Sequence, residues 1–520
     1  MTLIEERSVE PPATRSDPVA VAVRLRPREE RGIEQRFAPS DLPRGWDLAR
    51  NPRVARLLHN RKFQFLLILP NQIIFWLVIF VGVLGTVVPG LNFGTAITWY
   101  VWFCLVFVMM VVVGRAWCVM CPFGGFAEWI QRRSLWKRAQ RRLGLGRTLP
   151  EPVARYGFLL SVGSFLVLTF IEEFFNIAGP GNPIATSIMV LGIVTSALTF
   201  FLLFDRRTFC RYICPLSAVI GTIGGIGSVA GFRTRDRQVC LSCNTKDCMR
   251  GGDSGYGCPW YTWPGSADSN LSCGLCSECY KSCPSDNIGL YIQKPLTSLV
   301  APTRRRADVA WAIALLWGLV VFQQINALNI YASLDNWLNR VTHFPGYPNP
   351  VDYLGIIALV AAVTGGLVKL AQLALVRRDV PLESKGSFLE RHSRFRAFFL
   401  PMMYGIVPVV GADYFARQLP KFLAHAPRVL PAAGHLVGFG STSSRLYDMS
   451  LATGNKTVAI QLVVMGIGTL AALWTSWRIS GRELAPIARH PLAVRVSAVG
   501  LAAAFGVFAA VLYVAMHAAF

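Results

Sequence analysis

The chain contains the run Cys273-Gly-Leu-Cys276-Ser-Glu-Cys279-Tyr-Lys-Ser-Cys283-Pro284. Three closely spaced cysteines in a tight loop can turn their sulfurs toward one centre, and this spacing with a Cys-Pro ending is typical of [4Fe–4S] ligation. The fourth cysteine of such a run binds a second cluster where two clusters are present. Zinc is the alternative, and the Cys-Pro ending makes it the weaker one.

A second group lies upstream, with the spacing Cys240-x2-Cys243-x4-Cys248-x9-Cys258-Pro259. Together the two groups resemble a two-cluster bacterial ferredoxin with an insertion in its first half. That resemblance implies crossed ligation, in which one cluster takes Cys240, Cys243, Cys248 and Cys283. The other then takes Cys258, Cys273, Cys276 and Cys279. A four-cysteine zinc ribbon is the alternative, which the irregular spacing fits poorly.

Four further cysteines form two separate pairs, each ending in Cys-Pro. They are Cys118-x2-Cys121-Pro122 and Cys210-x3-Cys214-Pro215, each after an apolar stretch and just after arginine. The matching ends predict an internal repeat of two helical hairpins whose pooled thiols hold a third cluster. Two redox-active dithiols and a copper(I) site remain alternatives. The thirteenth cysteine, Cys104, lies within an apolar stretch and is interpreted as a small buried hydrophobe.

The composition favours a membrane protein, because 53% of the 520 residues are apolar and only 16% are charged. A bilayer needs about 20 apolar residues per helix. The predicted spans are 64–88, 92–114, 156–177, 184–204, 307–332, 351–376, 396–416, 457–477 and 492–518. The Gly-rich segment 213–232 is predicted to lie along the membrane surface. We therefore predict an all-α integral membrane bundle of about nine transmembrane helices, with an inserted two-cluster ferredoxin-like α+β segment in the cytoplasm.

Lysine and arginine crowd the loop 115–155, whereas the loops 89–91, 178–183 and 333–350 carry a single basic residue, Arg340. The positive-inside rule then predicts a cytoplasmic N-terminus, an external C-terminus, and clusters that face the cytoplasm from the inner (plasma) membrane. The loop 417–456 fits poorly, because it is placed outside yet is basic.

The predicted divisions follow from these patterns. They are a disordered polar tail over 1–60, a four-helix membrane unit with two Cys-Pro hairpin loops over 61–232, a two-cluster ferredoxin-like segment over 233–300, and a C-terminal membrane unit of about five helices over 301–520.

Two hairpins with Cys-Pro loops followed by a ferredoxin-like segment resemble the membrane polyferredoxins of the NapH/NosR type. The copper-reducing maturation proteins of the CcoG type have a similar layout. The resemblance covers roughly residues 60–300 and carries over to all twelve cysteines of the three sets. This chain has C-x2-C-P in its first hairpin where the family usually has C-x3-C-P, and the resemblance leaves residues 307–520 unexplained.

Polar residues within or beside the C-terminal spans suggest a quinone site, since a quinone head group needs hydrogen-bond partners beside an apolar slot. The candidates are Gln323, Gln324, Asn326, Asn329, Asp413, His425 and His435. The alternative is that the amides are interfacial and that Asp413 pairs with Arg417. Haem is disfavoured, because no histidine lies in the middle of a span.

We expect an electron-transfer protein that links a cytoplasmic redox carrier to the quinone pool or to a partner oxidoreductase. The ferredoxin-like segment and its flanks, 205–306, carry thirteen Lys and Arg against seven acidic residues, which favours an acidic carrier such as a ferredoxin or flavodoxin. The overall net charge of +23 is attributed mainly to membrane topology. No recognition motif accompanies the charge, so nucleic-acid binding is not expected. The alternatives are a copper reductase or maturation factor for another metalloenzyme, and a redox sensor.

Overall fold

The structure, a computed structural model, describes residues 45–135, 143–178, 181–267, 269–301, 305–376, 394–439, 441–442 and 444–518. Most of these residues are helical. Several helices are long and apolar enough to cross a bilayer, which confirms a multi-pass membrane architecture.

Eight such spans are present among the described residues, and a bent pair makes a possible ninth. They are α4 (Phe63–Leu84), the run α5 (Phe93–Thr95), η2 (Ala96–Trp102) and α6 (Phe103–Val113), α10 (Gly157–Phe174), α11 (Pro183–Leu203), α17 (Ala307–Ile325), α19 (Pro350–Leu375), α24 (Asn455–Ile479) and α25 (Pro491–Ala518). The pair is α20 (Arg394–Gly405) and α21 (Val407–His425), bent by 42°. Each predicted span corresponds to one of these elements.

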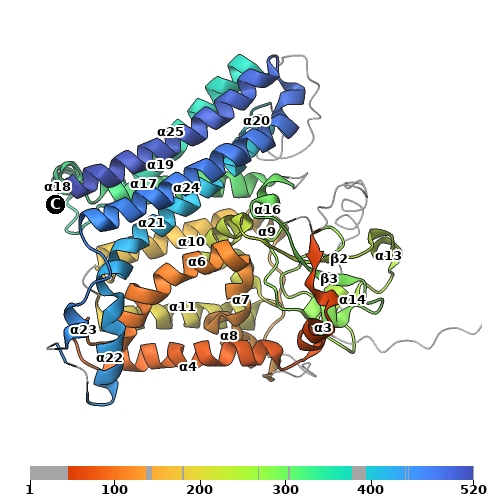
Figure 1. Cartoon of the computed structure of the whole chain (residues 1–520). Coiled ribbons are helices and arrows are strands. Elements are labelled where there is room, and N and C mark those ends of the chain that lie inside the picture. Colours follow the sequence, from red (N-terminus) through yellow and green to blue (C-terminus); the bar gives the residue numbers. More distant parts are fainter. Residues whose placement is uncertain are drawn as a thin grey trace, which may run out of the picture.

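The short elements gather at the two ends of the long helices (Figure 1). At one end lie α3 (Pro52–His59), α13 (Arg237–Ser242), α14 (Asp247–Arg250) and the sheet. At the opposite end lie α18 (Asn329–Thr342), α22 (Val429–Leu436) and α23 (Arg445–Asp448). The remaining short helices are η3 (Gly114–Ala116), α7 (Trp117–Met120), α8 (Pro122–Arg132), α9 (Glu151–Arg155), α15 (Glu278–Ser282), α16 (Thr297–Val300), η6 (Ala426–Arg428), η7 (Ser480–Leu484) and η8 (Ala485–Ile487).

The sheet frames the cysteine-rich segment. Its strand order is β1 (Trp46–Asp47), β3 (Ile288–Ile292), β2 (Val229–Thr234), and both pairings are antiparallel. Because β2 precedes the segment and β3 follows it, the pairing brings the two ends of the segment together.

Part of the predicted disordered tail is ordered. Residues 1–44 lie outside the described residues, but Asp47 and the helix α3 pack onto the sheet. Asp47 is buried, and its carboxylate accepts hydrogen bonds from Leu290 N at 3.1 Å and Arg235 Nε at 2.9 Å. These bonds fix the strand β1 beside β3, so the prediction was wrong for residues 45–60.

The Gly-rich segment 213–232 does not lie along the surface. It forms α12 (Pro215–Ile223) and η5 (Gly224–Ile226), and every residue of α12 from Ser217 to Ile223 is buried. The helix packs against α10, α17 and α21. Gly411 of α21 approaches Ile223 and Ile226 closely enough that a side chain would collide with Ile226 at 2.9 Å. Small residues therefore serve close helix packing here.

Candidate metal centre

The two Cys-Pro pairs have the same local geometry. Cys121 caps α7 and Cys214 caps the π-helical turn η4 (Phe209–Ile213), and each is followed by proline at the first position of the next helix. Their backbones are nearly identical, with φ −66° and ψ 125° at Cys121 and φ −52° and ψ 122° at Cys214. A residue before proline avoids the helical region, so each Cys-Pro step ends one helix and starts another. The hairpins are structurally equivalent at this point.

The unequal cysteine spacing is absorbed by the backbone. The first pair, with two intervening residues, spans the α-helical turn α7, whereas the second pair, with three, spans η4. In η4 the N–H of Cys214 donates to the carbonyl of Phe209, five residues earlier, at 2.8 Å. A π-turn accommodates one additional residue. The departure from the usual C-x3-C-P spacing therefore does not prevent the two pairs from occupying equivalent places.

Helix N-termini point at both capping thiols. The Cys121 sulfur accepts backbone hydrogen bonds from Phe123 and Gly124 at the start of α8, and the Cys214 sulfur accepts one from Leu216 at the start of α12. Burial raises the pKa of the Cys214 thiol to about 12, and the N–H of Leu216 acts against this. A bound metal supplies the remaining stabilisation that a thiolate needs in such a place.

The two pairs meet each other. A Cβ at Gly124 would lie 3.0 Å from the Cys210 sulfur, so the two hairpin loops are in direct contact there. Arg207 Nη1 donates to the carbonyl oxygen of Cys118 at 2.8 Å, which ties the second loop to the first. The thiol of Cys210 interacts electrostatically with those of Cys118, Cys121 and Cys214. We call these four residues the hairpin set.

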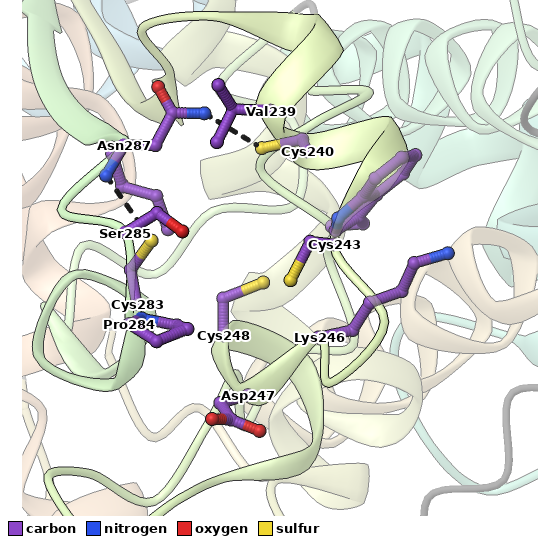
Figure 2. A pocket seen from close by; sticks show the side chains of 12 residues that line it. Val239, Cys240, Cys243, Lys246, Asp247, Cys248, Cys283, Pro284, Ser285 and Asn287 are labelled. Carbon is purple, nitrogen blue, oxygen red and sulfur yellow. Dashed lines mark hydrogen bonds between the residues drawn. The ribbon is translucent and has the colours of Figure 1, made fainter. Parts of the chain in front are cut away.

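A second group surrounds one pocket (Figure 2). It consists of Cys240, Cys243, Cys248 and Cys283, which we call the outer set. The Cys240 sulfur lies 3.0 Å from Thr234 Oγ1 and accepts from Asn287 Nδ2 at 3.4 Å, and Asn287 N donates to the Cys283 sulfur at 3.3 Å. Cys243 and Cys283 are partly exposed.

A third group lies deeper. The thiol of Cys279 interacts with those of Cys258, Cys273 and Cys276, and also with that of Cys248 of the outer set. We call Cys258, Cys273, Cys276 and Cys279 the inner set. Thr262 N donates to the Cys258 sulfur at 3.3 Å, four residues after a Cys-Pro step, as Asn287 does for Cys283. The structure thus brings together the same cysteines that the crossed ferredoxin pattern groups.

The three sets lie in a row. The outer and inner sets adjoin, because Cys258 N donates to the Cys248 carbonyl at 2.8 Å and their thiols interact. The inner and hairpin sets share two arginine neighbours. Arg207 interacts with Cys210 and Cys276, and Arg115 interacts with Cys118, Cys214 and Cys273. The inner set therefore lies between the other two.

Buried hydrogen-bond donors without a partner lie near the inner set. Within the part of the chain that the structure describes, Trp260 Nε1, Asn270 Nδ2 and Ser277 Oγ are buried and lack a hydrogen-bond partner. Trp260 and Ser277 adjoin ligand cysteines in sequence, and both Asn270 and Cys273 approach Gly231. Buried donors in native proteins are normally satisfied. Cluster sulfides, which accept such bonds, fit this lining.

In the described ranges, no group of three or more His, Cys, Asp or Glu side chains is placed so that it could hold a metal ion. A four-iron cubane binds each of its four thiolates at a different iron, and each set offers four cysteines.

Buried ion pairs hold the sets in place. Glu128 of α8 pairs with Arg207 at 2.6 Å and with Arg132 at 2.8 Å. Glu278 pairs with Lys281 at 3.0 Å and accepts from Tyr256 N at 2.9 Å. Burial raises the pKa of Glu278, but Lys281 and Arg132 outweigh it and lower the value overall. The hairpin loop and the ferredoxin-like segment are thus linked by fixed charges.

The polar residues of the C-terminal unit are only partly brought together. Asp413 Oδ1 accepts from Gln324 Nε2 and from the hydroxyl of Tyr513, both at 2.7 Å, and all three are buried. Arg417 forms its ion pair with Glu173 at 3.7 Å rather than with Asp413, as the alternative interpretation had it. Gln323, Asn326, Asn329, His425 and His435 do not join this cluster.

Sequence reasoning missed three residues at these sites. Tyr513 lies in an apolar span about 100 positions after Asp413, and no spacing rule connects them. Arg115 and Arg207 were noted before the Cys-Pro pairs but were given no role at the site. Their positions just before the Cys-Pro pairs were the available signal, since both side chains turn inward and are buried.

Comparisons with known proteins agree with this geometry. The family described as "4Fe-4S binding domain" matches residues 95–142 and 186–230, which contain the two hairpin pairs. Ferredoxin-type protein NapH of Escherichia coli (strain K12) is 32% identical over 140 residues, which cover 25% of this chain and 44% of that protein. No solved structure matches the chain.

The chain therefore spans less than half the length of the curated relative that it matches. The resemblance to the NapH-like membrane polyferredoxins is confirmed for the matched region. The matched family and the long apolar helices indicate a multi-pass membrane protein with a 4Fe-4S binding domain.

Proposed function

We propose that the protein binds three [4Fe–4S] clusters and links a cytoplasmic redox carrier to the quinone pool or to a membrane partner oxidoreductase. The observation that carries the proposal is the row of three four-cysteine sets, which runs from a partly exposed pocket to the ends of the membrane hairpins. When bound, such clusters accept and release single electrons. The protein's own residues position them and close them off from water.

The outer set is the proposed point of contact with the soluble carrier. Cys243 and Cys283 are partly exposed, and Lys246 lines the same pocket beside them (Figure 2). A cation next to the exposed cysteines favours an acidic partner such as a ferredoxin or flavodoxin. In the inner set only Cys273 is partly exposed.

The cytoplasmic orientation is supported by two facts. Both hairpin loops and the ferredoxin-like segment lie at the same end of the long helices (Figure 1). The basic loop 115–155 joins the helices at that end. By the positive-inside rule this end faces the cytoplasm, across the inner membrane.

The cluster of Gln324, Asp413 and Tyr513 supports the quinone branch. Asp413 Oδ2 and Gln324 Oε1 lack hydrogen-bond partners within the described ranges. Two free acceptors inside a membrane bundle suit a quinol hydroxyl. Asp413 lies on α21, which packs against α12, the helix that begins immediately after Cys214.

The test uses the purified full chain in liposomes that contain a quinone. Reduced flavodoxin added outside should reduce the quinone, and Asp413→Asn should slow this at least tenfold while leaving cluster reduction by flavodoxin unchanged. Gln461→Ala, which removes another buried polar side chain of the same unit, serves as the control. Reduction of copper(II) to copper(I) without reduction of the quinone would favour the alternative, a copper reductase or maturation factor.

A further inference from the structure

Arg115 is a buried cation without an acidic partner. Its side chain is 2% exposed, and it lies three residues before Cys118. Nη1 donates to Ser217 Oγ at 3.1 Å and Nη2 donates to the Ser217 carbonyl at 2.7 Å. Neither acceptor carries a charge. No carboxylate lies within ion-pair distance of it in the described part of the chain.

Other buried arginines of this protein have such partners. Arg207 lies 2.6 Å from Glu128, and Arg305 lies 2.8 Å from Glu483. Removing a charge from water costs several kcal/mol unless an opposite charge compensates it. Something other than a carboxylate must therefore compensate Arg115.

The sulfur neighbours of Arg115 come from two different sets. It interacts with Cys118 and Cys214 of the hairpin set and with Cys273 of the inner set. Its guanidinium also lies 5.2 Å from the ring of Trp260, two residues after the inner-set ligand Cys258. The cation thus sits between the two sets.

The guanidinium of Arg115 packs directly against the backbone of Gly221. A Cβ added at Gly221 would lie 2.3 Å from Arg115 Nη2 and 2.9 Å from the carbonyl oxygen of Leu271. Leu271 precedes Cys273 by two residues. The helix α12 therefore contacts both the guanidinium and the inner-set loop at this glycine.

We propose that Arg115 is the charge that compensates the hairpin and inner clusters together and raises the reduction potential of both. The inference rests on the proposed three-cluster function. An added electron makes each site more negative, and a fixed buried cation stabilises that state strongly at low dielectric. The cysteines that interact most with Arg115 belong to the hairpin and inner sets, so the cation favours an electron in these two membrane-side sites over one in the outer site.

The test is a redox titration followed by EPR on the anaerobically purified full chain. Arg115→Gln should lower the reduction potentials of the hairpin and inner components. The ratio of electrons in these two components to electrons in the outer component should fall at least tenfold. For a one-electron couple this is about 59 mV. Arg115→Lys, which keeps the charge, should restore most of the shift, and Arg305→Gln should leave all three potentials unchanged.

Glu128→Gln should shift the reduction potentials in the opposite direction. It leaves Arg207 uncompensated beside Cys210 and Cys276, so the same two potentials should rise. Equal shifts in the same direction for Arg115→Gln and Glu128→Gln would indicate local loosening and overturn the inference, as would unchanged potentials in Arg115→Gln. If Arg115→Gln loses the hairpin cluster, the inner component of the same variant decides: a lowered inner potential supports the inference, and an unchanged or raised one overturns it. If the unsubstituted protein binds only two clusters, the proposed three-cluster function fails instead of the inference about Arg115. The iron content of the unsubstituted protein distinguishes these two outcomes.

Discussion

At the residue scale, the hairpin set depends on four cysteines that come from positions almost 100 residues apart. Their convergence is fixed by small and charged neighbours. Gly124 allows the Cys210 sulfur to touch the first loop, and Arg207 bonds the Cys118 carbonyl. The same residues explain why single substitutions at this site should not act independently.

If the hairpin set binds one cluster, its cysteines act as one unit. Cys118→Ser and Cys214→Ser should each remove the same EPR component and lower iron from about twelve to about eight atoms per chain. The double variant should lose no more than either single one, because non-additivity is expected for residues that share a partner. Iron content and EPR of the three purified variants measure this.

Cys276→Ser is the matched control for that experiment, since it should remove a different component and leave the hairpin component in place. Separate dithiols would be indicated by full iron content in Cys118→Ser and Cys214→Ser, with only thiol reactivity changed.

At the element scale, the Cys-Pro steps and the antiparallel pairing of β2 with β3 organise the site. The helix starts at Pro122 and Pro215 and the repeat of two hairpins could be predicted from the sequence, because proline restricts the residue before it. The π-turn at Phe209–Ile213 could not, since propensities do not distinguish it from an α-turn.

Other element-scale predictions failed for tertiary reasons. The segment 213–232 is apolar and Gly-rich, and nothing local says whether such a helix lies on a surface or is covered by α17 and α21. Residues 45–60 follow a polar, Pro-rich stretch and carry four basic residues, counting His59, yet one buried carboxylate, Asp47, holds them to β3. Both outcomes depend on partners that are distant in sequence.

The crossing of the ferredoxin-like ligands gives an element-scale prediction. Cys283→Ser should remove the same EPR component as Cys240→Ser, although Cys283 is adjacent in sequence to the inner-set cysteines, because Cys283 lines the outer pocket. Cys258→Ser should pair with Cys279→Ser in the same way. Loss of the Cys279 component in Cys283→Ser would show that ligation follows the sequence order instead.

At the scale of the whole molecule, the poor fit of the basic loop 417–456 has a structural explanation. Arg417 pairs with Glu173, Lys421 Nζ donates to the Ala178 carbonyl at 2.7 Å, and Arg428 Nε donates to the Tyr447 carbonyl at 2.9 Å. These cations are used in contacts between helices and are therefore weak topology signals. The alternation of the spans places the two termini of the bundle at opposite ends.

Reporter fusions test that topology. Fusions near residues 140 and 260 should read cytoplasmic, because the basic loops stay inside, and a fusion after residue 518 should read external. Alkaline phosphatase and green fluorescent protein, which are active on opposite sides of the membrane, give the readout. An external signal near residue 260 would place the clusters on the outer side and reverse the proposed direction of contact with the carrier.

The central claim is that twelve cysteines in three converging sets hold three clusters in a row. The most direct measurement is the iron and acid-labile sulfide content of the anaerobically purified chain, with EPR of the reduced protein. The account predicts about twelve iron and about twelve sulfide per chain, in three distinguishable components. A clean value of about eight of each, with no component lost in Cys118→Ser, would contradict it.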